Sequence, residues 1–443
     1  MAFSRTRRPS LLAAALFAAA CAVANAQVAS VQPAHPPSPD SGNPGNTQSG
    51  ISATAATPAS LPISLPVAWQ KAVAANPGLQ AARFGAAAAE GVVMQAKARP
   101  NPELAYSQED TRRTTRSSTL QVNQLIELGG KREARMRLAQ SEASGAQLEA
   151  SHALVTLRFE VHNRFSELQM AEERLRYAEQ IHELATRTLD SAEKRVAAGK
   201  VPPLEASRAS VAKANAALEQ SQARSAVVTA RQQLASLWNG SAAEVGATVT
   251  DEDEATAPPD METMERQLEQ SPALLQAGNA LDQARASSEL ERARRIQDPT
   301  VSLGVKRAEE VGRNQVVLGV SIPLPLFDSN AGNQLQALRK ADQAEQLLQE
   351  RRLQLRAQLF TARQTLVNSR QQATLLGSDV LPLAQSAYDI ALRGFSLGKF
   401  NFLDVLDAQR SLFDARRQWI EQRMAARRAQ AEIEQLLGTS ALP

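Results

Sequence analysis

Two carboxylates in the segment DVLDA, Asp404 and Asp407, are the side chains whose type and spacing point most directly to a chemical role. Residues three apart lie on the same face of a helix. Asn401 followed by Asp404 has the pattern of a helix N-cap with an acid at the third helical position, where a carboxylate stabilises the positive end of the helix dipole. A cap is therefore one explanation for Asp404, and a shared surface role for both acids is the other.

The other residues that could do chemistry do not form a catalytic or metal-binding pattern. The sequence has no glycine loop that would cradle a phosphate, no pair of cysteines and no HExxH motif. His152, His162 and His182 are 10 and 20 residues apart. On one helix they would be separated by roughly 15 Å or more, whereas zinc–nitrogen bonds are about 2 Å. We expect no enzyme activity, no cofactor and no metal site.

The composition favours long helices. The 443 residues are rich in Ala, Leu, Gln, Glu and Arg, and only 4% are aromatic. The formal net charge is +3, and basic residues are interspersed with acids rather than clustered. Nucleic acid is therefore not an expected partner.

The N-terminus has the pattern of an export signal. Arg5, Arg7 and Arg8 precede an apolar run that begins at Leu11 and is too short to span a bilayer, and cleavage after Ala26 would remove residues 1–26. The single cysteine, Cys21, lies inside this segment, and lipid attachment there after cleavage before Cys21 is the alternative. Residues 27–60 are rich in Pro, Ser, Ala, Asn and Gly, which predicts a disordered leader.

An internal repeat organises the rest of the chain. RVAAGKVPPLEASRA at 195–209 corresponds to GFSLGKFNFLDVLDA at 394–408, and NPGLQAA at 76–82 corresponds to SPALLQA at 271–277. Across four such pairs the offset stays between 195 and 199 residues. We therefore predict a first repeat over 61–240, a linker over 241–260 and a second repeat over 261–439.

Each repeat should contain the same elements. The long helices, about 67 residues each, would be roughly 100 Å long. The expected helices and strands of the first repeat are a helix at 65–98, strands at 102–108 and 117–126, and helices at 131–197 and 203–238. Those of the second repeat are a helix at 261–296, strands at 299–307 and 315–323, and helices at 330–396 and 402–437.

The expected strands alternate between apolar and small or polar residues. Val316, Leu318, Val320 and Ile322 alternate with such residues, a pattern typical of transmembrane β-strands. Four strands cannot close a barrel with a usable lumen, and open sheet edges in lipid leave backbone groups unpaired. Several chains must then contribute, and three chains would supply twelve strands.

A different class of protein stays open on the helical pattern alone. Ala344, Leu348, Leu355, Leu359 and Leu366 recur at coiled-coil spacings. If the strands are set aside, this pattern is also typical of a periplasmic coiled-coil scaffold without a pore.

Four segments carry a resemblance that extends from about 62 to 439. ELGGKREAR (127–135), PLEASRA (203–209), PLPLFDSNAGNQ (323–334) and LGKFNFLDVLDAQRSLFDARR (397–417) resemble the TolC-like outer membrane efflux proteins, and in particular their CzcC-like, heavy-metal branch. The resemblance implies a mostly α fold with four β-strands in two tandem repeats. It also implies a homotrimer with a twelve-stranded barrel in the outer-membrane lipid, continued by a long α-helical barrel in the periplasm.

The resemblance also implies a function and partners. The chain would be the passive, gated outer membrane duct of a tripartite system, together with a periplasmic membrane-fusion adaptor and an inner-membrane resistance-nodulation-division (RND) pump. Its cargo would be heavy-metal cations of the cobalt, zinc and cadmium type. The same duct serving drugs or other small organic compounds remains the alternative.

In this family the turns between the long helices form the periplasmic entrance. The resemblance therefore implies that Asp404 and Asp407 of three chains line that entrance as rings, which would attract cations. Family gates tie neighbouring helices with an aromatic and a basic residue, but the basic position is occupied here by an aromatic side chain. The residues expected near the gate are Phe395 as the aromatic, Phe400 at the basic position, and Glu205 and Arg208 from the first repeat.

Overall fold

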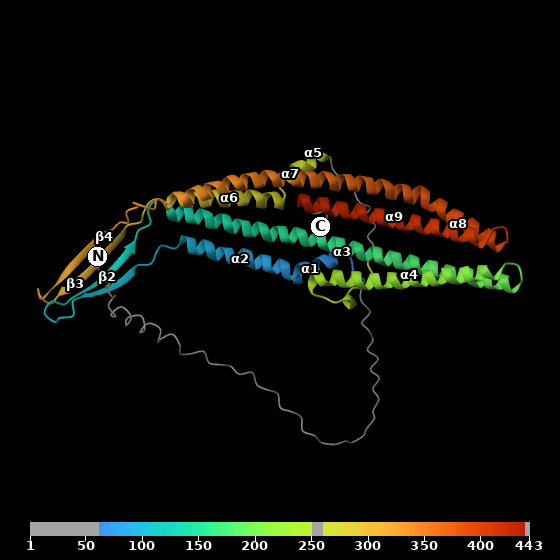
Figure 1. The fold of residues 1–443 in the computed structure, drawn as a ribbon, viewed down its shortest axis with the longest axis horizontal. Helices are drawn as coiled ribbons and strands as arrows, with labels where there is room; N and C mark the ends of the chain where they lie inside the picture. Colours follow the sequence, from blue (N-terminus) through green and yellow to red (C-terminus); the bar gives the residue numbers. More distant parts are fainter. Residues whose placement is uncertain (1–61, 250–259, 439–443) are drawn as a thin grey trace, which may run out of the picture. The chain divides into compact units, whose positions relative to one another are not determined.

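Long helices make up most of the protein, and a small sheet joins them at one end (Figure 1). The computed structural model describes residues 62–249 and 260–438. The predicted signal peptide, the leader, Cys21 and part of the linker lie outside these residues.

The described elements follow the order expected for two repeats. The first series is α1 (Leu65–Ala75), α2 (Pro77–Lys97), β1 (Glu103–Glu109), β2 (Ser117–Leu125), α3 (Lys131–Ala197) and α4 (Pro203–Ala235), with short 3₁₀ turns η1 (Ser236–Trp238) and η2 (Ala242–Glu244). The second is α5 (Met261–Leu268), α6 (Pro272–Ala293), β3 (Thr300–Ala308), β4 (Arg313–Ser321), α7 (Ala331–Leu375), the π turn η3 (Leu376–Val380), α8 (Leu381–Ser396) and α9 (Phe402–Leu437). The predicted class, mostly helical with four strands, is confirmed.

Three of the expected helices are interrupted, each next to a proline. The helix expected at 65–98 breaks at Asn76, whose extended backbone and side-chain cap start α2 at Pro77. The helix expected at 261–296 breaks in the same way before Pro272. The helix expected at 330–396 contains the π turn η3 just before Pro382, whose missing N–H and bulky ring are incompatible with a regular helix ladder.

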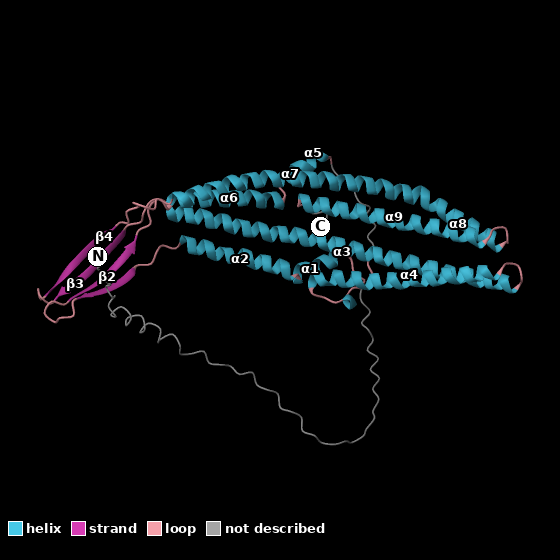
Figure 2. Ribbon diagram, viewed as in Figure 1, coloured by secondary structure: helices cyan, strands magenta, loops and turns pink. Residues whose placement is uncertain are grey.

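The four strands form one antiparallel sheet in the order β1-β2-β3-β4 (Figure 2). The register aligns Leu104, Val122, Leu303 and Leu318 in one row across the strands. These four side chains are all exposed, from 45% for Val122 to 77% for Leu318. One face of the sheet is therefore apolar and uncovered in the single chain.

Helix α3 connects the two halves. It packs against α2 and α4, and also against α6 and α9, while α7 packs against α6 and α9. Leu168 and Leu234 belong to a buried core that joins α3 with α4, and Leu359 and Ile433 belong to another that joins α7 with α9. Phe395 belongs to a core beside the α3–α4 and α8–α9 turns, at the end of the helices opposite the sheet (Figure 1). Within the described residues, no helix combines the length and apolar content needed to cross a membrane.

Candidate functional site

The turn between α3 and α4 ends the first long helix with a left-handed glycine. Gly199 has φ +66°. Its N–H donates to the carbonyl of Val196 (2.9 Å), and the N–H of Lys200 donates to the carbonyl of Arg195 (2.9 Å). This is the hydrogen-bond pattern of a Schellman motif, in which glycine avoids the steric penalty of positive φ.

The turn between α8 and α9 repeats this backbone. Gly398 has φ +76°. Its N–H donates to the carbonyl of Phe395 (2.9 Å), and the N–H of Lys399 donates to the carbonyl of Gly394 (2.8 Å). The correspondence of the two segments in sequence is thus a correspondence of backbone geometry.

The helices that follow the two turns begin differently. Asn401 Oδ1 accepts from the N–H of Asp404 (3.1 Å), and Asp404 Oδ2 accepts from the N–H of Asn401 (3.0 Å). The predicted cap of α9 is therefore confirmed as a complete capping box. Helix α4 begins at Pro203 after an extended Pro202 and has no side-chain cap.

Asp404 and Asp407 both lie exposed on α9, on the side away from the buried Phe402 and Val405. Across residues 62–249 and 260–438, neither carboxylate is within ion-pair distance of a basic side chain. The cap occupies one oxygen of Asp404. The carboxylate of Asp407 is left facing solvent in the single chain.

A basic residue that the sequence patterns did not single out, Arg195, connects the two turns. Its Nη1 donates to the carbonyl of Phe395 (2.7 Å), and its guanidinium carbon lies 4.4 Å from the centre of the Phe395 ring. The Phe395 side chain is only 2% exposed. The contact therefore joins a backbone hydrogen bond and a cation–π interaction at one residue of the second repeat.

Phe400, which occupies the expected basic position, does not make this connection. A Cβ added to Gly394 would lie 2.1 Å from Phe400 Cδ2, so the Phe400 ring lies directly on Gly394 in its own turn. Phe395 packs with Phe402, with ring centres 5.8 Å apart. Phe395 and Phe402 thus form the local core of this turn, whereas Phe400 is 44% exposed, and the basic partner of Phe395 comes from the other repeat.

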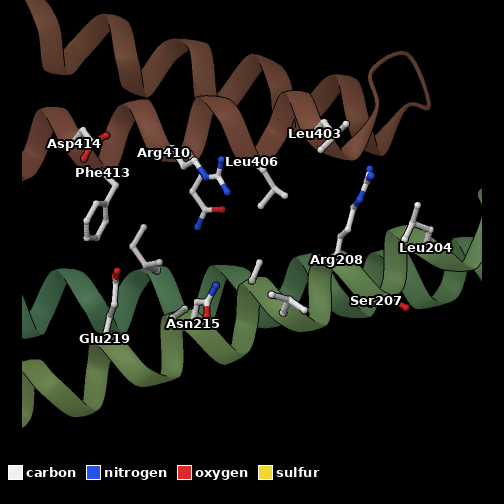
Figure 3. Close-up of a pocket in the computed structure, with 15 residues that line it drawn as sticks. Leu204, Ser207, Arg208, Asn215, Glu219, Leu403, Leu406, Arg410, Phe413 and Asp414 are labelled. Carbon is white, nitrogen blue, oxygen red and sulfur yellow. The ribbon is translucent and has the colours of Figure 1, made fainter.

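Of the gate neighbours expected from the first repeat, neither Glu205 nor Arg208 makes a hydrogen bond or a cation–π contact with Phe395 within the described residues. The Glu205 Oε2 atom is buried and has no hydrogen-bond partner within the described part of the chain. Arg208 instead points into a groove between α4 and α9 (Figure 3).

This groove has a volume of about 590 Å³. Ile181 of α3 also lines it. Glu219 and Phe413 lie at the end of the groove that is farther from the turns (Figure 3). Phe413 packs on Tyr177, with ring centres 5.7 Å apart. Burial raises the pKa of the Tyr177 hydroxyl to about 12, and burial also raises the pKa of the Glu219 carboxyl above its usual value.

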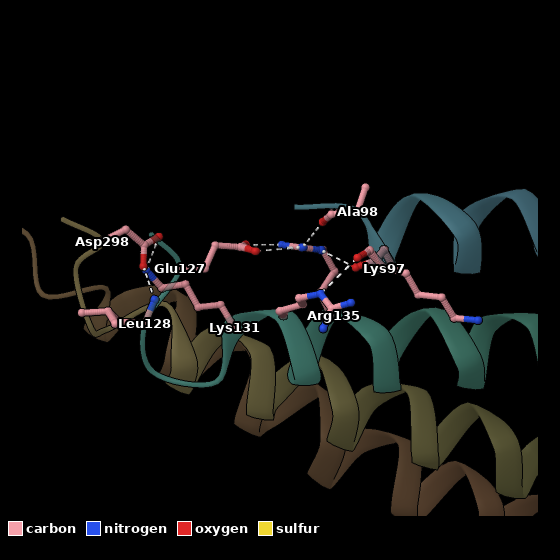
Figure 4. Close-up of polar contacts among 9 residues, drawn as sticks. Lys97, Ala98, Glu127, Leu128, Lys131, Arg135 and Asp298 are labelled. Atoms are coloured by element: carbon pink, nitrogen blue, oxygen red, sulfur yellow. Dashed lines mark hydrogen bonds and ion pairs between the residues drawn. The ribbon is translucent and has the colours of Figure 1, made fainter. Parts of the chain in front are cut away.

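A polar junction fastens the helices to the sheet at the opposite end (Figure 4). Arg135 binds Glu127 through both terminal nitrogens (2.5 and 3.2 Å) and also donates to the carbonyls of Ala96 and Ala98 (3.1 and 3.0 Å). The carbonyls at the end of α2 are thereby paired, as the end of a helix requires.

The same junction also joins the two repeats. Asp298 accepts from the N–H of Leu128 (2.8 Å) and pairs with Lys131 (2.8 Å). Gly129 has φ +69°, and a Cβ there would lie 2.8 Å from Ile296 Cβ, so only glycine fits this approach. These contacts explain the ELGGK sequence structurally.

Comparison with known proteins identifies the family. The model of the outer membrane efflux protein family matches residues 68–240 and 263–439. The chain is 40% identical over 377 residues to the cobalt-zinc-cadmium resistance protein CzcC of Cupriavidus metallidurans, covering 85% of this chain and 90% of that protein. It is 26% identical over 302 residues to the nickel-cobalt-cadmium resistance protein NccC of Alcaligenes xylosoxydans xylosoxydans, covering 67% and 68%.

Solved structures share the fold. CusC aligns with a TM-score of 0.74 at 18% identity, covering 85% of this chain and 92% of that chain. VceC of Vibrio cholerae aligns with a TM-score of 0.73 at 18% identity, covering 85% and 96%. Because the family model matches both halves and the CzcC similarity covers most of both proteins, this chain belongs to the outer membrane efflux protein family.

Proposed function

We propose that this protein is the outer membrane channel of a heavy-metal efflux system and exports cations of the cobalt, zinc and cadmium type. The observation that carries the proposal is the 40% identity to a cobalt-zinc-cadmium resistance protein over 85% of the chain. The four-stranded sheet at one end of long helices supports it, because this is the fold of the channels CusC and VceC.

The active form would be a homotrimer. The outer strands β1 and β4 each pair with only one strand within the described residues, so each presents an open edge. The uncovered row of Leu104, Val122, Leu303 and Leu318 would face lipid. Joining β4 of one copy to β1 of the next would pair both edges, and a closed barrel is the arrangement that leaves no unpaired edge in a membrane.

The helices offer a second reason for assembly. Leu383 and Ile390 on α8 and Leu397, the residue that caps its C-terminus, are seven residues apart and are 71%, 52% and 71% exposed. The opposite side of α8 is buried through Tyr388 and Phe395. An exposed apolar row at coiled-coil spacing is what a neighbouring copy would cover.

The helical end opposite the sheet would be the periplasmic entrance. In a trimer, Asp404 and Asp407 from each chain would surround one opening and attract cations. Phe395 and Arg195 would hold the two turns of each chain together beside it. The channel would be passive, and a periplasmic membrane-fusion adaptor and an inner-membrane RND pump would supply cargo and energy.

The division of the chain follows from this role. We propose that residues 1–26 direct export, that 27–60 form a leader, and that the repeats at 61–240 and 261–439, joined by the linker at 241–260, each contribute half of one subunit wall. Processing at Cys21 would decide whether a lipid also anchors the chain.

Growth of a strain that lacks this protein tests the proposed cargo. We expect greater sensitivity to cobalt, zinc and cadmium, restored by the intact gene, with drug tolerance unchanged. A strain sensitive only to organic drugs would favour the drug-exporting alternative, and unchanged growth on both metals and drugs would contradict an efflux role.

A further inference from the structure

The apolar face of the sheet ends in a polar row near the two hairpins, which lie at the end of the sheet away from the helices (Figure 2). Next to the Leu104 row, toward the hairpins, the same face carries Tyr106, Leu120, Val305 and Val316. The row after that carries Gln108, Ser118, Arg307 and Asn314.

Tyr106 joins the last apolar row to this polar row. Its hydroxyl lies 3.1 Å from Gln108 Oε1 and 3.4 Å from Ser118 Oγ. A tyrosine with an apolar ring and a polar tip is typical of the boundary between lipid and water. In the proposed barrel, the polar row would therefore lie at the level of the lipid head groups.

Two arginines at this level share one carboxylate. Arg307 Nε lies 3.3 Å from Glu309 Oε1, and Arg116 Nη2 lies 3.7 Å from the same oxygen. The side chains of Arg116 and Arg307 are 42% and 63% exposed. In the described part of the chain, neither has another ion-pair partner. Each guanidinium has five N–H donors, so both groups can bind a further acceptor, and the cluster keeps a positive charge.

The hairpin between β1 and β2 adds two more arginines. Asp110, at φ +62°, accepts from the N–H of Arg112 (3.1 Å) through one carboxylate oxygen and from a threonine hydroxyl of the same hairpin through the other. This loop leaves the side chains of Arg112 and Arg113 exposed. Among residues 62–249 and 260–438, neither side chain has an ion-pair or hydrogen-bond partner.

The charge and position of this end of the sheet fit lipid phosphate. Residues 110–116 and 307–313 contain five arginines and three acids. Guanidinium groups bind phosphate oxygens through paired hydrogen bonds. Arg307 follows the alternation of Leu303 and Val305, so it belongs to the face that would meet lipid and not to the face that would line the channel.

We infer that Arg116 and Arg307 bind phosphate groups of the outer-leaflet lipid, the phosphorylated lipid A of lipopolysaccharide, and that Arg112 and Arg113 add positive charge above them. Glu309 holds the two guanidinium groups at one oxygen and so orients them. The inference rests on the proposed function, because it places the sheet in the outer membrane and the helices in the periplasm. The residues of the site all come from one chain.

Binding of lipid A to the purified assembly of full-length chains, followed by native mass spectrometry, tests the inference. The probes are lipid A with two phosphates and the same lipid A without phosphates. We expect the unchanged protein to bind the phosphorylated form about tenfold or more tightly than the other. Arg116→Gln with Arg307→Gln should abolish most of this preference. Arg116→Lys with Arg307→Lys keeps both charges and should retain most of it.

The matched control is Arg137→Gln with Arg294→Gln. It removes two exposed arginines from ion pairs with Glu289 and Glu291, on the helical side of the sheet. Its preference should stay within about twofold of that of the unchanged protein. Equal binding of the two forms of lipid A by the unchanged protein would overturn the inference, and so would an equal loss of preference in the control. Displacement of lipid A by inorganic phosphate at the same concentration would also overturn it, because the site would then recognise the free anion.

The outcome is separable from the proposed function. If the unchanged protein shows no preference for phosphorylated lipid A while a strain lacking the protein is metal-sensitive, the lipid site fails and the efflux function stands. If the strain is not metal-sensitive, the efflux function fails whatever lipid the sheet binds.

Discussion

The α3–α4 turn and the α8–α9 turn have the same backbone and different side-chain roles. Both end a helix with a Schellman motif, at Gly199 in one case and Gly398 in the other. Only the second continues into a capping box, built by Asn401 and Asp404. The repeat therefore preserves the path of the chain, and the functional difference lies in side chains that the backbone does not constrain.

The two turns also cooperate across the repeat. Arg195 corresponds to Gly394 by the offset of the two segments, and Val196 corresponds to Phe395. Because position 394 has no side chain, Phe400 packs against it, and because position 195 is an arginine, it reaches Phe395 in the other turn. The first repeat supplies the guanidinium group of Arg195, and the second repeat supplies the ring and the carbonyl of Phe395. Two identical copies could not form this pair.

The two turns should differ most in the loss of stability that follows truncation of Phe395 and of Val196, which occupy corresponding positions in the two repeats. Phe395→Ala removes a fully buried ring and should cost about 3–5 kcal/mol, whereas Val196→Ala, at a half-buried position, should cost about 1 kcal/mol. Thermal unfolding of the detergent-solubilised protein, followed by far-ultraviolet circular dichroism, measures both. Similar losses for the two variants would mean that the turns contribute equally to the core.

Removal of the contact between Arg195 and Phe395, which joins the two turns, should have the second-largest effect. Arg195→Ala deletes a charge-assisted hydrogen bond of the kind that contributes about 1.5–3 kcal/mol, less the effect of solvent on a half-exposed side chain. In planar bilayers we expect higher resting conductance, since the two turns can then separate. Arg393→Ala, an exposed arginine of α8, is the control and should leave the conductance unchanged.

Replacement of the two glycines should affect both turns alike. Gly199→Ala and Gly398→Ala each place a side chain at positive φ, which costs roughly 1–2 kcal/mol. The two melting temperatures should fall by similar amounts. A fall confined to one variant would contradict the equivalence of the two backbones.

The smallest expected effect on stability is the difference between substitutions at the N-termini of α9 and α4. Asn401→Ala removes the side-chain half of the capping box and should cost about 1 kcal/mol. Pro202→Ala should cost less, because α4 has no side-chain cap to lose. Equal melting temperatures for Asn401→Ala and the unchanged protein would show that the cap contributes nothing to the stability of the turn.

Local signals in the sequence predict most of the fold. Left-handed positions favour glycine, so Gly199 and Gly398 mark the turns, and strict alternation marks the strands. The helix breaks before Pro77 and Pro272 also have a local signal, because proline suits the first turn of a new helix and not the interior of a long one. The single helices expected over 65–98 and 261–296 overlooked that signal.

The candidate site is less predictable than the fold for a physical reason. The Asn401–Asp404 cap is local and follows from spacing. The contact of Arg195 with Phe395 joins residues 200 positions apart, and no local pattern encodes it. The one available signal is the repeat itself, because the 199-residue offset places Arg195 and Phe395 at neighbouring positions of two corresponding turns.

The ion selectivity of the purified channel tests the central proposal most directly, that this protein is a cation-conducting duct whose entrance is lined by the acids of the second turn. We expect the reversal potential of the unchanged channel in a salt gradient to indicate cation selectivity, and Asp404→Asn with Asp407→Asn to reduce it. The control Asp190→Asn with Glu193→Gln, which neutralises two exposed acids of α3 near the first turn, should retain it. Anion selectivity in the unchanged protein, or equal selectivity in all three proteins, would contradict the proposal.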